Sequence, residues 1–312
     1  MSCMALDAST ADRAEILTAI ALAEYMTCRF DKALQTIQRL REIGEDLTGY
    51  DQGPVMGMSG VIKVMSGHRL DGLRDLEVAR RLGLESDPVT LAGAVAYWVD
   101  LVVFGFELVG DAMMTETERA LRLAEEYGDG SEFATYGLSI ARWARGTALL
   151  HCEPARRSEA LELLRLSRKF GGDVAVGPID AQIAAAMRRQ GDIDDELIDS
   201  LAAKVASELD AGDLTYFGYG ATELVKLLIA RAREDDLKSA HRVATRLAAE
   251  IGAISQPALE LWPLLCQILL TDVQGDTVGH AAALAQYRDI AKALDARGHL
   301  ITAAIISKAG AS

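Results

Sequence analysis

The feature of this sequence that most constrains its fold is the spacing of its apolar residues. They recur three and four positions apart almost throughout, and no convincing run of alternating apolar and polar residues occurs. Such spacing places apolar side chains on one face of an α-helix, whereas a half-buried strand needs a period of two. Aromatic residues make up only 5% of the chain and prolines number 6, which disfavours a sandwich or barrel. The sequence predicts an all-α fold of about fourteen helices with short links.

Residues that favour helix ends divide the chain into these helices. Thr10 can cap a helix that runs to Met26, and Asp87 followed by Pro88 marks another helix start. Several glycines fall where helices are expected to stop, because glycine readily adopts the left-handed backbone that ends a helix. These glycines are Gly128, Gly171, Gly191, Gly252 and Gly275.

The predicted helices come in pairs with a repeating junction, at residues 27–34, 66–73, 151–161 and 232–240. The first junction fits the tetratricopeptide pattern, with an aromatic residue in the turn and small residues where the paired helices approach closely. Similar registers can be set further along, whereas the middle helices are longer than the unit of about 34 residues allows. The positions used are Leu17, Ile20, Ala21, Phe30, Ala33, Ile37, Leu40, Ala160 and Ala240.

These observations predict one domain, a tetratricopeptide-like superhelix of antiparallel helix pairs over residues 1–312. The glycine-rich stretch 170–178 breaks the helical rhythm. We expect a hinge there, dividing 1–170 from 178–312.

Three segments, 120–151, 210–249 and 257–303, give the chain a resemblance to a known group of proteins. They look like the C-terminal helical region of large actinobacterial, mycobacterial-type signalling proteins. In those proteins a class III adenylate cyclase domain or a winged-helix regulator is combined with a P-loop ATPase and a tetratricopeptide-like array. LuxR-type relatives append a helix-turn-helix. The resemblance implies a regulatory helical module, with any cyclase or ATPase activity residing in domains that this sequence does not contain.

The charge balance disfavours two classes of partner. Lys and Arg number 32 against 46 Asp and Glu, which gives a net charge of −14. A surface this acidic repels phosphate backbones and anionic lipid, so we expect neither nucleic acid nor membrane as a partner. The most apolar stretch, residues 88–106, approaches the length of a membrane span. It contains Asp100 and lacks flanking Lys or Arg, which indicates a buried core helix instead.

The cysteines and the first residues predict a cytoplasmic location. No basic segment followed by an apolar core is visible at the N-terminus, so no signal peptide is expected. Widely spaced cysteines in a chain of this size are typical of a reducing compartment rather than of a disulfide framework. They are Cys3, Cys28, Cys152 and Cys266.

No catalytic motif is present in the sequence. It contains no phosphate-binding G-x-x-x-x-G-K-[ST], no dinucleotide-binding turn, no H-E-x-x-H and no pair of histidines one helical turn apart. Asp195 and Asp199 lie four positions apart, but helix capping explains such acids better than metal binding does. Catalysis by a cysteine and a histidine needs neighbours in space and stays open. We expect no enzyme, cofactor or metal; an all-α metal-dependent enzyme is a remote alternative.

One basic and aromatic segment, residues 131–146, is a candidate binding surface. Tyr136 and Trp143 share a helix face, and the register around Ala160 predicts that Arg142 and Arg145 line the concave side. Two arginines there could hold a peptide carboxylate. The competing interpretation places Trp143 in the core and the arginines in solvent or in ion pairs.

The sequence therefore supports two hypotheses of function. The first is a non-enzymatic module that binds a protein or peptide partner, such as a separate cyclase or ATPase. The second is a sensor that binds a small molecule or peptide in the concave groove. A chain starting within an array should expose an apolar face of its first helix, near Ile16, Ile20 and Leu22, which predicts a homodimer.

Overall fold

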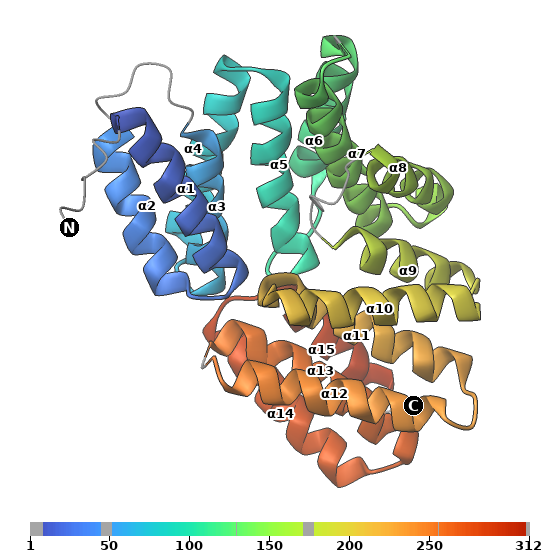
Figure 1. The fold of residues 1–312 in the computed structure, drawn as a ribbon. Coiled ribbons are helices and arrows are strands. Elements are labelled where there is room, and N and C mark those ends of the chain that lie inside the picture. Colours follow the sequence, from blue (N-terminus) through green and yellow to red (C-terminus); the bar gives the residue numbers. More distant parts are fainter. Residues whose placement is uncertain (1–8, 45–51, 129, 171–177, 255, 310–312) are drawn as a thin grey trace, which may run out of the picture.

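The computed structural model describes residues 9–44, 52–128, 130–170, 178–254 and 256–309, and every regular element in those ranges is helical. The all-α prediction is confirmed, with fifteen α-helices in the described ranges (Figure 1). They are α1 (Thr10–Met26), α2 (Phe30–Gly44), α3 (Gly53–Met65), α4 (Arg69–Glu85), α5 (Pro88–Val103), α6 (Asp111–Tyr127), α7 (Glu132–Cys152), α8 (Arg157–Phe170), α9 (Ile179–Gln190), α10 (Asp195–Ala211), α11 (Leu214–Arg231), α12 (Asp236–Gly252), α13 (Pro257–Gln274), α14 (Thr277–Ala293) and α15 (Arg297–Ala309). A short 3-10 helix, η1 (Pro154–Arg156), precedes α8.

Local sequence sets many of the helix ends. Ser9, one residue before the predicted cap, caps α1: its hydroxyl accepts from Asp12 N, and the Asp12 carboxylate accepts from Ser9 N. Asp87 caps α5 as predicted, by accepting from two backbone amides. Gly191 and Gly275 end their helices with left-handed backbone, at φ 84° and 71°. Short-range hydrogen bonds therefore decide where these helices begin and end.

The other glycine-rich positions differ from these. Gly252 is the last residue of α12, and Ala253 takes the capping position after it. Gly171, and the proposed hinge apart from its end residues 170 and 178, lie outside the described residues.

Successive helices pack against each other as antiparallel pairs, including α1 with α2, α3 with α4, α7 with α8, and α13 with α14. Small residues stand at the seams as the repeat register predicts: Ala33, Ala160 and Ala240 are all 0% exposed. Ile20 was also assigned to the packing face of its helix, but 42% of its surface is exposed on α1. This sequential pairing is the packing of a helical repeat.

α5 is the most apolar helix, and it is buried among its neighbours rather than exposed. It packs against α3, α4, α6 and α7. None of the helices in the described ranges is long and apolar enough to cross a membrane. The prediction of a core helix for this stretch is confirmed.

The C-terminal end of the array folds back onto the segment that follows α5. His299 N donates to Gly105 O over 2.9 Å, and Arg297 N donates to Phe106 O over 3.4 Å. The buried His299 ring adds two bonds, because Nε2 donates to Phe104 O and Nδ1 accepts from the Tyr287 hydroxyl. Residues almost 200 positions apart are thus joined, and we call these contacts the α5–α15 closure.

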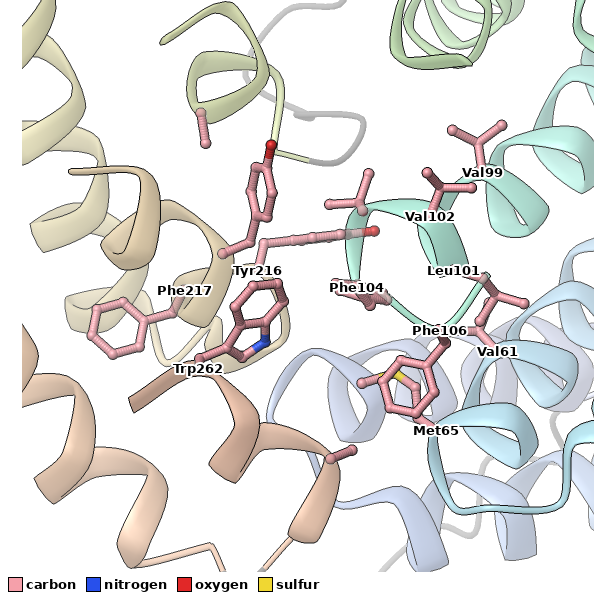
Figure 2. Packing of buried hydrophobic residues seen from close by; sticks show 14 of the residues in the cluster. Val61, Met65, Val99, Leu101, Val102, Phe104, Phe106, Tyr216, Phe217 and Trp262 are labelled. Atoms are coloured by element: carbon pink, nitrogen blue, oxygen red, sulfur yellow. The ribbon is translucent and has the colours of Figure 1, made fainter. Parts of the chain in front are cut away.

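A second set of long-range contacts joins the N-terminal helices to the start of α11. The Thr215 hydroxyl donates to Tyr25 O at the end of α1, over 2.7 Å. The Tyr216 hydroxyl donates to an oxygen of the Asp100 carboxyl group on α5, over 3.1 Å. Figure 2 shows Tyr216 and Phe104 in the same apolar packing. These contacts hold the start of α11 against α1 and α5.

Asp100→Asn is expected to raise the free energy of unfolding at pH 8 by about 1 kcal/mol or more. Asp100 is 3% exposed, and burial raises its pKa well above the usual 3.8. The folded protein therefore keeps a proton that the unfolded chain releases, so stability is lost as the pH rises above the unfolded-state pKa. Asparagine retains an acceptor for Tyr216 and has no proton to lose as the pH rises. In urea denaturation, the difference in free energy of unfolding between variant and wild type should increase from pH 5 to pH 8. A variant less stable than wild type at pH 8 would contradict this account.

Candidate ligand-binding site

The closure of the array leaves a hollow of about 350 Å³, which we call the junction pocket. It lies between the C-terminal part of α5 with the segment after it, and α7, α9, α11, α13 and α15. Its volume is in the range of pockets that hold small ligands. The polar side chains that matter below are Glu107, His151, Arg189, Tyr219, Glu223 and Lys226. The main apolar ones are Val102, Leu108, Trp262, Leu265, Ile301 and Ile305.

Glu223 on α11 is the most buried carboxylate of the pocket, with its side chain only 2% exposed. Lys226 Nζ donates to its Oε1 over 2.6 Å, and the Arg188 guanidinium donates to its Oε2 over 3.0 Å. Burial alone would raise the pKa of Glu223, but Lys226 and Arg188 outweigh burial and lower that pKa to about 2. Glu223 is therefore ionised, and it holds two cations in place.

Arg189 adds a third cation to the same wall. One of its guanidinium nitrogens donates to Leu150 O, at the end of α7, over 2.9 Å. A guanidinium has five N–H donors, so this single bond uses only part of its capacity. Two cations thus pair with Glu223, and the nearby Arg189 also lowers its pKa, although the whole chain has a net charge of −14.

Tyr219 supplies an unused hydrogen-bonding group. Its side chain is 5% exposed, its ring meets Trp262 edge to face, and its hydroxyl has no hydrogen-bond partner among the described residues. Burial raises the pKa of Tyr219, so the hydroxyl keeps its proton. A buried hydroxyl without a partner costs free energy. The pocket therefore contains a donor for which the described residues supply no acceptor.

His151 and Glu107 complete the polar lining. His151 contacts the Gln182 amide oxygen, and burial together with the nearby Arg189 lowers its pKa to about 4. His151 is thus neutral at pH 7. Glu107, on the segment after α5, pairs with Arg69 and with Arg297, its Oε1 lying 3.7 Å from an Arg297 nitrogen. Through its pair with Arg297, Glu107 connects the pocket wall to the start of α15.

The apolar part of the pocket reaches solvent. Trp262 and Leu265 on α13 are buried, whereas Leu108, Ile301 and Ile305 are 43%, 45% and 63% exposed. Exposed apolar side chains that line a hollow favour contact with another apolar group.

The residues predicted from segment 131–146 lie elsewhere, on α7. Trp143 is 1% exposed and belongs to the core, and Tyr136 is 37% exposed. Arg142 lies over the Phe170 ring, 5.7 Å from its centroid. Arg145 is 4% exposed, donates to Met114 O over 2.9 Å and pairs with Glu118. The competing interpretation is therefore right for Trp143, while ligand binding by this set stays a prediction.

The acidic segment at 191–199 marks the start of α10, as expected. Its cap is Asp194, whose carboxylate accepts from Leu197 N over 2.8 Å. Asp195 pairs instead with Arg231 and Arg233, both over 2.6 Å. Among the described residues, no three His, Cys, Asp or Glu side chains come together as a metal site.

Sequence reasoning missed the junction pocket. Tyr219 stands out in the sequence only as one of several aromatic residues in α11, and the pair Arg188 and Arg189 only as basic residues at the end of α9. The spacing of Glu223 and Lys226 on one helical turn was a visible but common signal. Nothing local indicates that these helices meet the segment after α5.

No protein-family model matches the chain, and no curated protein matches it. The fold defines an all-helical domain of sequential antiparallel helix pairs.

Proposed function

We propose that this chain is a non-enzymatic binding and regulatory module, and that its ligand site is the junction pocket. The observation that supports this most directly is the unpartnered Tyr219 hydroxyl in a pocket that Arg189 and Lys226 also line and that opens to solvent. These groups offer hydrogen-bond donors and positive charge.

The pocket's position supports a regulatory role. Its lining includes Gly105, Gly298 and His299, which lie at the α5–α15 closure. A ligand that contacts both sides of this closure would stabilise the closed array by binding it more tightly than an opened one. In this proposal a signalling partner binds the closed array and not the opened one. The resemblance to actinobacterial regulators supports a cyclase or an ATPase as that partner.

Affinity capture from the native lysate tests this function. The tagged chain should retain a specific protein or small molecule, identified by mass spectrometry, and Ile305→Trp should abolish the capture by filling the pocket opening. Val273→Trp is the matched control, because Val273 on α13 is 51% exposed and does not line the pocket. Equal capture by both variants would contradict a role for the pocket.

The first helix supports self-association. Ile16, Ile20 and Leu22 are 54%, 42% and 44% exposed on α1, as the sequence predicts. Covering these side chains removes apolar area from water. We expect light scattering to give about twice the mass of one chain, and Ile16→Lys with Ile20→Lys to give a monomer. A monodisperse wild-type monomer would contradict the dimer.

A further inference from the structure

The walls of the junction pocket differ in chemistry. α9 and α11 contribute Arg189, Tyr219 and Lys226, whereas α13, α15 and the segment after α5 contribute mainly apolar side chains, among them Trp262 and Ile301. A ligand that satisfies both walls has a hydrogen-bond acceptor on one side and an apolar body on the other.

The polar wall favours a negatively charged acceptor. Lys226 has three N–H donors and gives one to Glu223, and Arg189 gives one of its five to Leu150 O. The Tyr219 hydroxyl has no acceptor among the described residues. Hydrogen bonds from these groups to a carboxylate are stronger than bonds to a neutral oxygen.

The carboxylates already in the lining limit the charge of the ligand. Glu223 and Glu107 both line the pocket, and their negative charges oppose a phosphate dianion more strongly than a monoanion. The hollow of about 350 Å³ fits a compact molecule rather than a polymer. We propose that the junction pocket binds a small organic monocarboxylate, whose carboxylate meets Arg189, Lys226 and the Tyr219 hydroxyl and whose apolar body packs on Trp262. This inference rests on the proposed function.

A panel of acids and their amides tests the ligand class. Calorimetry and melting curves are measured with octanoate, 4-phenylbutyrate and indole-3-acetate, each beside its primary amide, and with acetyl-Ala-Ala-Leu bearing a free or an amidated C-terminus. We expect at least one small carboxylate to bind and to raise the melting temperature, with its amide at least tenfold weaker. Equal binding of acid and amide, no binding of any acid at millimolar concentration, or binding of the free-acid peptide alone would overturn the proposal.

Variants locate the bound carboxylate. Tyr219→Phe removes only the unpartnered hydroxyl and should weaken binding about tenfold with folding intact. Tyr25→Phe removes a hydroxyl from another buried tyrosine, outside the pocket, and should leave affinity unchanged. Lys226→Met should weaken binding, and Glu223→Gln should strengthen it severalfold by removing a competing negative charge. Wild-type affinity in both Tyr219→Phe and Lys226→Met would overturn the assignment.

The outcomes also separate the two proposals. If the acids fail while Ile305→Trp still abolishes capture from the lysate, the carboxylate inference is wrong and the binding function stands. If the acids fail and capture is unchanged by Ile305→Trp, both are wrong.

Discussion

Glu223→Gln is expected to lower the free energy of unfolding by about 3 kcal/mol at pH 7. The substitution removes the carboxylate that compensates Arg188 and Lys226, while it keeps the shape of the side chain. These cations are 23% and 25% exposed, so water replaces only part of the lost interaction. The remaining positive charges repel one another at the pocket wall.

The effect should depend on pH in a defined direction. The pKa of Glu223 is about 2 in the folded protein, below its ordinary 4.5. A lowered pKa means that the ionised form is favoured by folding, so this stabilisation is present above pH 4.5 and is lost as the pH falls toward 2. The difference between wild type and variant in urea denaturation should therefore shrink over that window.

An ion pair whose carboxylate is exposed provides the control for this prediction. Glu118 pairs with Arg145 over 3.5 Å but is 72% exposed, so Glu118→Gln should cost less than about 1 kcal/mol. Equal losses for the two variants at pH 7 would show that burial of Glu223 does not decide the effect.

Gly105→Ala is expected to destabilise the protein by about 3 kcal/mol and to loosen the α5–α15 closure. Gly105 has φ +74°, and an added Cβ would lie 2.7 Å from the His299 ring. The variant therefore combines backbone strain with overpacking in the place where His299 N bonds Gly105 O. Chemical denaturation should show the loss, and hydrogen exchange should show faster exchange at the His299 amide.

Gly191→Ala separates the two causes. Gly191 has φ +84° at the end of α9, and an added Cβ would meet no atom within 4 Å. Only the backbone cost of about 1 kcal/mol is expected there. If both glycine variants lose the same stability, the contact between Gly105 and His299 is not tight and the closure does not depend on it.

These two predictions concern two residues that line the same pocket. Glu223 organises the cationic wall, and Gly105 permits the close approach of α15 to the segment after α5. Changes at either position should therefore alter ligand affinity as well as stability. Figure 2 shows Phe104, Phe106 and Trp262 as members of one cluster of buried side chains, and Trp262 also lines the pocket.

The sequence by itself determined the helices and much of their pairing. Apolar spacing near the helical period predicts the fold class, and Asp87 and Gly191 mark helix ends because capping depends on atoms only a few residues away. Ala33 and Ala160 were identified as seam positions because close helix packing requires small side chains. Each of these inferences uses interactions within one helix or between neighbouring helices.

Only the tertiary structure decided where the pocket lies and which charges it brings together. The sequence around Arg145 does not indicate that it donates to Met114 O between α6 and α7. Arg189 lines the pocket although no distinctive local pattern marks it. The difference arises because the curvature of the array accumulates over many helix pairs, and contacts such as His299 with Gly105 join residues almost 200 positions apart. A sequence pattern that repeats every helix pair specifies the packing of neighbours, but it does not specify which distant surfaces meet when the array closes.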